Sequence, residues 1–446
     1  MNRSKRSLTH VQVIAFGYLL MIAVGTILLM LPISSADGVS AGFLDSFFTS
    51  TSASCVTGLI MRDTATGWSL FGQIVIIVLI QIGGLGFMTI ATFFYLILNR
   101  RMGLREREIM VESINVTQIG GIMKLSKYIV TGTAVFELSG ALLLSIRFIP
   151  RFGFAKGLWY GVFHSISAFC NSGFDLMGII SPFSSLTSFY DDWFVNIIIM
   201  FLITIGGLGF LVWDDLSKYG FKWKKYRFHT KLVLSVSAVL TFGGALVIFF
   251  LEKDFTGSDL SLGNRILTAL FASVTARTAG FNTVDVASMS GGGKLITMIL
   301  MFIGGSPGST AGGVKTTTLA CLVLYSLGNL GGQKKPTLFG RSISQDILRK
   351  SSNICVLNLS LALLAGTIIS FMQNLDLTDI MFECFSAIGT VGMTAGITQS
   401  LVPFNALIIA LLMILGRVGS VTFAVAILNR RANSAIRYPE EEIIVG

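Results

Sequence analysis

Phe48-Thr-Ser-Thr-Ser-Ala-Ser-Cys-Val-Thr-Gly58 is a short segment whose two ends, a phenylalanine and a glycine, recur three more times along the chain. The phenylalanine stands ten residues before the glycine in every pair except the third, where it stands nine before. The later pairs are Phe163 with Gly173, Phe271 with Gly280, and Phe382 with Gly392. The glycines follow one another about 110 residues apart, and a period this long indicates a repeated structural unit.

The amino-acid composition is unusually apolar. Of the 446 residues, 53% are hydrophobic and only 13% are charged, which favours a bilayer over water as the solvent. Eight apolar runs are long enough to cross a hydrocarbon core of about 30 Å, although the sixth is broken midway. They are residues 11–31, 70–98, 128–149, 193–212, 232–251, 295–328, 354–372 and 404–428. We therefore expect eight membrane spans.

A shorter apolar segment lies between the two spans of each pair: residues 43–54, 158–169, 264–275 and 378–387. Each segment is too short to cross and is predicted to be a re-entrant pore helix, which must be surrounded by protein or by a water-filled cavity. The second spans also echo one another. Ile82-Gly-Gly-Leu-Gly-Phe87 returns as Ile205-Gly-Gly-Leu-Gly-Phe210, and more loosely as Ile303-Gly-Gly-Ser-Pro-Gly308 and Leu415-Gly-Arg-Val-Gly-Ser420.

The sequence therefore predicts an all-α membrane protein made of four span–pore helix–span repeats arranged pseudo-fourfold around one central pore. The predicted repeats are residues 1–105, 106–225, 226–335 and 336–446. Most of the 33 lysine and arginine residues lie at the termini and in the three loops between repeats. By the positive-inside rule, both termini and the C-terminal tail are cytoplasmic and the pore helices enter from outside. This placement explains the net charge of +10 better than nucleic-acid binding does.

The loop after each pore helix ends in one of the four glycines and contains no ring of acidic side chains. Re-entrant helices that stop mid-membrane point their partially negative C-terminal ends inward, which favours a cation and repels anions. Main-chain carbonyls would then be the ligands, because glycine permits the φ > 0 conformations that turn them toward an axis. The predicted filter segments are 55–58 (Cys55, Val56, Thr57, Gly58), 170–173 (with Asn171, Ser172, Gly173), 277–280 (with Thr278, Ala279, Gly280) and 389–392 (with Thr390, Val391, Gly392).

Four span–pore helix–span units, each with one filter glycine, resemble the superfamily of K⁺ transporters that contains the Trk, Ktr and HKT proteins. The resemblance covers essentially the whole chain, and the short tails resemble KtrB-like membrane subunits. In that family, glycine at all four filter positions goes with K⁺ preference, and serine at the first goes with Na⁺ permeation. The glycines here keep the K⁺ pattern. No loop carries the full K⁺-channel string, which implies fewer ion sites and some Na⁺ passage.

The resemblance also implies partners. KtrB-like subunits form homodimers with one pore per protomer and sit on a cytosolic ring of nucleotide-binding, KtrA-like RCK subunits. ATP, ADP or NAD would bind only to that partner, K⁺ is the substrate, and this chain would need no cofactor. Membrane lipids are further expected partners, and the implied location is the plasma membrane.

The sixth span is interrupted by ten residues that cannot continue a stable helix: Gly304, Gly305, Ser306, Pro307, Gly308, Ser309, Thr310, Ala311, Gly312 and Gly313. We expect a flexible constriction just below the filter, and the resemblance implies that this loop is the gate; a packing kink is the alternative. Arg417 lies in the eighth span, where an unpaired charge costs at least about 2.5–3.5 kcal/mol. It resembles the family's pore-obstructing arginine, and a structural ion pair is the alternative.

The favoured hypothesis for function is channel-like K⁺ uptake driven by the membrane potential. An alternating-access cation carrier is the alternative, although such carriers use inverted repeats and these four units run in parallel. A membrane enzyme or scaffold would need a catalytic constellation or a large partner-binding domain, and neither is visible. The scattered cysteines and histidines predict no transition-metal site.

Two further cations are left with open roles. Arg277 is expected to face away from the ion and brace the filter, for instance against a carboxylate. Lys315 fits an inner vestibule and a solvated helix start equally well.

Overall fold

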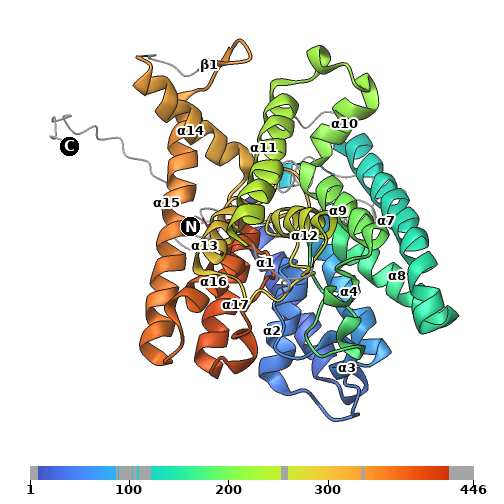
Figure 1. Cartoon of the computed structure of the whole chain (residues 1–446). Coiled ribbons are helices and arrows are strands. Elements are labelled where there is room, and N and C mark those ends of the chain that lie inside the picture. The colour runs from blue at the N-terminus through green and yellow to red at the C-terminus, as the bar shows by residue number, and fades with distance from the viewer. Residues whose placement is uncertain are drawn as a thin grey trace.

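The computed structural model describes residues 9–86, 122–252, 260–332 and 337–420, together with residues 89, 103, 108 and 109. Within these ranges the regular structure is helical apart from one hairpin, β1 (Thr337–Leu338) and β2 (Arg341–Ser342), and Figure 1 shows the helices packed side by side. Both predicted cytoplasmic termini, most of the loop between the first two repeats, and the far ends of the spans at 70–98 and 404–428 lie outside the described residues.

The main helices form four groups of the same order. A long helix opens each group: α1 (His10–Met30), α7 (Ile122–Phe152), α11 (Phe228–Leu251) and α15 (Gln345–Met372). A short helix follows, which confirms helices at the four predicted short segments: α2 (Gly42–Cys55), α8 (Phe154–Phe169), α12 (Leu262–Thr275) and α16 (Leu377–Gly389). The closing helices are α4 (Leu70–Leu85), α9 (Trp193–Leu208), α13 (Gly291–Phe302) and α17 (Pro403–Val418). The remaining helices are α3 (Thr64–Gly67), α10 (Phe210–Tyr219) and α14 (Thr316–Leu330).

Four described helices are long and apolar enough to cross a membrane, and they are the opening helices of the four groups. Together α9 and α10 make a fifth candidate, although they meet at 100°. The helices α4, α13, α14 and α17 are apolar but shorter. The break predicted within residues 295–328 is present, because α13 and α14 are separated by a loop.

The recurring glycine motif of the closing helices ends each helix rather than continuing it. Gly86, Gly209 and Gly419 directly follow α4, α9 and α17, and their φ angles are +82°, +96° and +94°. Residues with a side chain rarely adopt this backbone conformation, whereas glycine adopts it readily and so allows the chain to leave the helix. The apolar run 193–212 is therefore not one straight helix, since α9 ends at Leu208 and α10 departs at 100° after Gly209.

Each short helix packs closely on the long helix of its own group. In the first three groups, a glycine of the long helix faces a serine of the short helix, and a β-carbon on that glycine would lie 2.4–2.5 Å from the serine oxygen. Each serine hydroxyl donates to a carbonyl of the long helix, at 2.7–2.8 Å. The pairs are Gly25 with Ser50, Gly140 with Ser165, and Gly244 with Ser273. Small residues thus bring the two backbones together.

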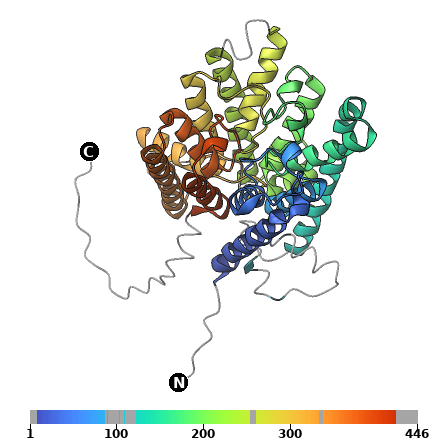
Figure 2. The same ribbon diagram turned by 90° about the horizontal axis from the view of Figure 1, so that it is seen from below.

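The four groups contact one another in a closed order. The closing helix of each group packs on the short helix of the next: α4 on α8, α9 on α12, α13 on α16, and α17 on α2. Figure 2 shows the groups following one another around the molecule, from blue through green and yellow to orange. The marker phenylalanines are buried within this packing: Phe48, Phe163, Phe271 and Phe382.

Candidate functional site

The four glycines singled out in the sequence lie against one another, in the same closed order as the helix groups. A β-carbon built on each glycine would collide with the carbonyl oxygen that precedes the glycine of the next loop. The distances are 2.2 Å from Gly58 to Ser172, 2.5 Å from Gly173 to Ala279, 2.4 Å from Gly280 to Val391, and 2.0 Å from Gly392 to Thr57. No larger residue fits any of the four positions without a shift of backbone.

The four loops share one backbone conformation although their sequences differ. Each glycine has a positive φ, and so does the residue two positions before it, whatever its type. The φ angles are +57° and +99° for Val56 and Gly58, +60° and +71° for Asn171 and Gly173, +74° and +82° for Thr278 and Gly280, and +50° and +94° for Thr390 and Gly392. Non-glycine residues in this region mark functional or strained sites.

The carbonyls of Thr57, Ser172, Ala279 and Val391 have no donor within the described ranges. All four residues are 0% exposed, and none of the hydrogen bonds of the loops ends on these oxygens. A buried carbonyl without a donor costs free energy. A ring of carbonyl oxygens is, however, what replaces the hydration shell of an alkali cation.

Hydroxyl groups at the ends of the short helices hold the loops, and the sequence reasoning missed them. Ser52 Oγ accepts from the Gly58 N–H at 3.0 Å, and Ser386 Oγ accepts from the Gly392 N–H at 3.1 Å. In the second and third candidate filter loops the hydroxyl donates instead, to the carbonyl that follows the glycine. Ser167 donates to Phe174 at 2.6 Å, and Thr275 donates to Phe281 at 2.7 Å. The available signal was a Ser six residues before the glycine in three repeats, and a Thr five before it in the shorter third loop.

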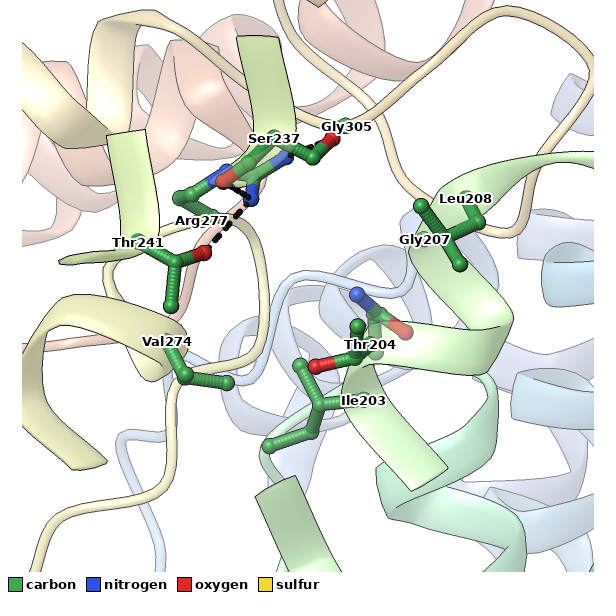
Figure 3. A pocket seen from close by; sticks show the side chains of 10 residues that line it. Ile203, Thr204, Gly207, Leu208, Ser237, Thr241, Val274, Arg277 and Gly305 are labelled. Carbon is green, nitrogen blue, oxygen red and sulfur yellow. Dashed lines mark hydrogen bonds between the residues drawn. The ribbon is translucent and has the colours of Figure 1, made fainter. Parts of the chain in front are cut away.

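Arg277 points away from the ring of glycines and toward α11. Its guanidinium donates to the Ser237 carbonyl at 3.3 Å, the Ser237 hydroxyl at 3.1 Å and the Thr241 hydroxyl at 3.0 Å, as Figure 3 shows. The expected direction is confirmed, but the partners within the described residues are hydroxyls and a carbonyl rather than a carboxylate. The group also lies just beyond the C-terminal end of α12, where the helix dipole favours a cation. It borders a cavity of about 20 Å³ that Asn171 and Gly305 also line.

The loop between α13 and α14 is tied to its surroundings by backbone hydrogen bonds. The N–H groups of Ser306 and Thr310 donate to the carbonyls of Gly207 and Gly206 in α9, at 3.0 and 3.2 Å. Gly313 donates to Gly416 in α17 at 3.3 Å. These bonds satisfy backbone N–H groups of the loop, as non-helical backbone buried within a membrane protein would require.

The same loop touches the equivalent position of three candidate filter loops. The Thr310 hydroxyl lies 3.2 Å from the Asn171 amide. A β-carbon on Gly312 would lie 2.1 Å from Thr390 Oγ1, and one on Gly304 would lie 3.2 Å from Thr278 Cγ2. Asn171, Thr278 and Thr390 all stand two residues before a filter glycine.

Arg417 links the loop to the end of α4. Its guanidinium donates to the carbonyls of Thr310 and Gly83, and to the Gly84 carbonyl at 3.1 Å. The partners of Arg417 in the described part of the chain are carbonyls, so the alternative of a structural ion pair finds no support there. Lys315 donates to the Ala311 and Gly312 carbonyls of the loop, at 2.7 and 3.2 Å. Lys315 thus stabilises the loop through these two carbonyls and is not a freely solvated group.

Comparison with known proteins gives consistent results. The family model described as TrkH, cation transport protein, matches residues 4–434. The potassium/sodium uptake protein NtpJ of Enterococcus hirae is 40% identical and matches 100% of this chain and 99% of its own length. The Ktr system potassium uptake protein B of Bacillus subtilis is 40% identical over 98% and 97% of the two chains. The crystal structure of the potassium transporter TrkH from Vibrio parahaemolyticus has a TM-score of 0.75 at 16% identity, covering 95% of this chain and 86% of that one.

Proposed function

Because the chain belongs to the TrkH family of cation transport proteins, we propose that it is a channel-like K⁺ uptake subunit that conducts K⁺ down its electrochemical gradient. Membership of this family makes the chain a multi-pass membrane transport protein rather than an enzyme. Relatives at 40% identity are named potassium or potassium/sodium uptake proteins. The membrane potential supplies about 2.3 kcal/mol per charge and 100 mV, so uptake needs no cofactor on this chain.

The observation that carries this proposal is the ring of four buried carbonyls without donors, at Thr57, Ser172, Ala279 and Val391. Four short helices end at these loops, and their partially negative C-terminal ends favour a cation. The filter would be the segments 55–58, 170–173, 277–280 and 389–392, in an eight-span, pseudo-fourfold arrangement around one pore. The closed order of helix contacts supports that arrangement.

The gate, in this proposal, is the loop 304–313 together with Arg417. The loop touches three filter loops, and Arg417 places a positive charge beside it. A cation in a cation path raises the electrostatic barrier to conduction. The described contacts therefore fit a closed pore that opens when the loop moves.

Two of the relatives are named as B proteins of Ktr systems, which supports a partner subunit for this chain. We expect a homodimer in the plasma membrane with cytoplasmic termini, bound to a cytosolic RCK ring that carries the regulatory nucleotide. Lipids would surround the opening helices, whose outward residues include exposed apolar side chains such as Leu20, Leu142, Phe242 and Leu364.

Flux into liposomes tests the transport proposal. Purified protein should accumulate a K⁺ tracer when the potential is inside-negative, with K⁺ as the only permeant ion. Uptake that requires a proton or Na⁺ gradient at fixed potential would contradict the channel-like mechanism and favour a carrier. Because the described contacts fit a closed pore, the assay includes Arg417→Ala beside the wild type; failure of both folded proteins to move either alkali ion would refute the proposal.

A further inference from the structure

One position of the short helices carries a titratable side chain in only two of the four repeats. Nine residues before the filter glycine stand His164 in α8 and Glu383 in α16. The same position holds Thr49 in α2, and in the shorter third repeat Ala272 corresponds to it. His164 is 0% exposed and Glu383 is 1% exposed. A polar group this deeply buried requires partners.

Glu383 holds the segment that follows the fourth filter loop (389–392). One carboxylate oxygen accepts a hydrogen bond from the Thr394 hydroxyl, and the other accepts from the Thr398 hydroxyl at 3.0 Å. Thr394 stands two residues after Gly392, and its own oxygen accepts from the Gly396 N–H at 2.9 Å. The carboxylate therefore fixes two points of the segment just beyond the filter.

His164 likewise holds the segment that follows the second filter loop (170–173). Its Nε2 accepts from the Leu176 N–H at 3.3 Å, and its Nδ1 lies 2.7 Å from the Tyr160 carbonyl. An N–H donor on one side and a carbonyl on the other fit only the neutral ring with the proton on Nδ1. The ring also packs against Phe281, next to Gly280 of loop 3, with centroids 6.3 Å apart.

The chain just beyond the first filter loop (55–58) contacts the segment that follows the fourth (389–392), and the chain just beyond the third filter loop (277–280) contacts the segment that follows the second (170–173). Gln399, in the segment that Glu383 holds, donates to the Ile60 carbonyl two residues after Gly58, at 3.4 Å. Asn282 stands two residues after Gly280. Its main-chain N–H donates to the Ser185 hydroxyl at 3.0 Å, and its main-chain carbonyl accepts from the Leu186 N–H at 2.8 Å. Loops 2 and 4 are not neighbours in the ring of glycines, so the two buried groups act from opposite sides.

We propose that Glu383 and His164 are positioning residues that set the K⁺ over Na⁺ discrimination of the whole filter without touching the ion. The inference rests on the proposed K⁺ filter. Discrimination by carbonyls depends on where they stand and how freely they move. Two braces that fix loops 2 and 4 directly, and loops 3 and 1 through them, control both properties.

The test compares variants that keep or remove the hydrogen-bonding atoms, using the ratio of K⁺ to Na⁺ flux into liposomes. Glu383→Leu removes the acceptors of two hydroxyls and should lower this ratio by about fivefold or more, since the loss of even one hydrogen bond corresponds to about fivefold. Glu383→Gln keeps one acceptor oxygen and should largely restore the ratio. His164→Leu and His164→Gln form the same pair in repeat 2. The control is Thr49→Val at the equivalent position of α2, since the buried Thr49 hydroxyl has no partner in the described residues.

A flux ratio separates positioning from folding, because a smaller amount of folded protein lowers both fluxes equally. If Glu383→Leu does not fold, Thr398→Val removes one donor and leaves the carboxylate, and a lowered ratio would carry the same conclusion. Wild-type ratios in folded Glu383→Leu, His164→Leu and Thr398→Val proteins would overturn the inference. Gly58→Ser, measured alongside, separates the two failures: if it lowers the ratio, only the inference fails; if it does not, the filter itself is wrong.

Discussion

Arg417 donates a hydrogen bond to the main-chain carbonyl of Thr310, and this bond joins the end of α17 to the loop between α13 and α14. The same guanidinium reaches the carbonyls of Gly83 and Gly84 at the end of α4. One side chain of repeat 4 thereby connects repeats 1 and 3.

Replacing Arg417 with alanine should raise basal K⁺ flux, because it removes both a positive charge beside the loop and the contact that holds Thr310. The measurement is tracer uptake into liposomes without any regulatory partner. Arg417→Lys keeps the charge but lacks the rigid, planar five-donor guanidinium that bonds carbonyls of both the loop and α4, so its flux should lie between those of wild type and Arg417→Ala. Unchanged flux in both variants would reduce Arg417 to a packing role.

Gly58→Ser should reduce K⁺ over Na⁺ discrimination, since its β-carbon would meet the Ser172 carbonyl at 2.2 Å. Gly38→Ser is a matched control: Gly38 also has a positive φ, +70°, but no atom lies within 4 Å of its β-carbon position. Both substitutions carry backbone strain of roughly 1–3 kcal/mol. Only Gly58→Ser should change the ratio of K⁺ to Na⁺ uptake in transport-deficient cells.

Ser52→Ala should weaken selectivity moderately by leaving the Gly58 N–H without its acceptor, a loss of about 1–3 kcal/mol for a buried donor. Ser54→Ala removes the same atom from the same helix, but the Ser54 hydroxyl has no partner in the described residues. Equal flux ratios for the two variants would show that the Ser52 bond does not shape the filter.

Asp215 is a candidate for a stability test away from the filter. Its side chain is 0% exposed and accepts from the Thr230 hydroxyl at 2.6 Å and the Arg227 N–H at 3.0 Å, joining α10 to α11. Asp215→Ala removes the acceptor of both hydrogen bonds, which should cost about 1–3 kcal/mol and lower the melting temperature in detergent. Asp214→Ala removes ion pairs of a partly exposed carboxylate and should cost about 0–1 kcal/mol. Similar melting temperatures for the two variants would contradict the burial argument.

The short helices and the meeting of the four glycines could be predicted because repetition reinforces a weak local signal. The third loop is one residue shorter, yet Thr278 adopts the same positive φ as its counterparts. Other features had no distinct signal. Ser52 lies in a run where every residue from Thr49 to Ser54 except Ala53 carries a hydroxyl, so composition could not single it out.

The turn at Gly209 was missed for a different reason. Hydropathy continues unbroken from α9 into Phe210. At the turn, the Phe210 N–H donates to the Gly308 carbonyl of the loop at 2.7 Å, and the Pro307 carbonyl lies 2.7 Å from the β-carbon position of Gly209, which leaves room only for glycine. Long-range contacts of this kind are not encoded in the periodicity of a single segment.

The loop that touches Asn171, Thr278 and Thr390 has a mechanical consequence. If this loop moves away, three candidate filter loops lose a neighbour at the same time. Opening of the pore and its selectivity would then change together. A partly open pore should conduct more ions than the closed one and discriminate less well between K⁺ and Na⁺.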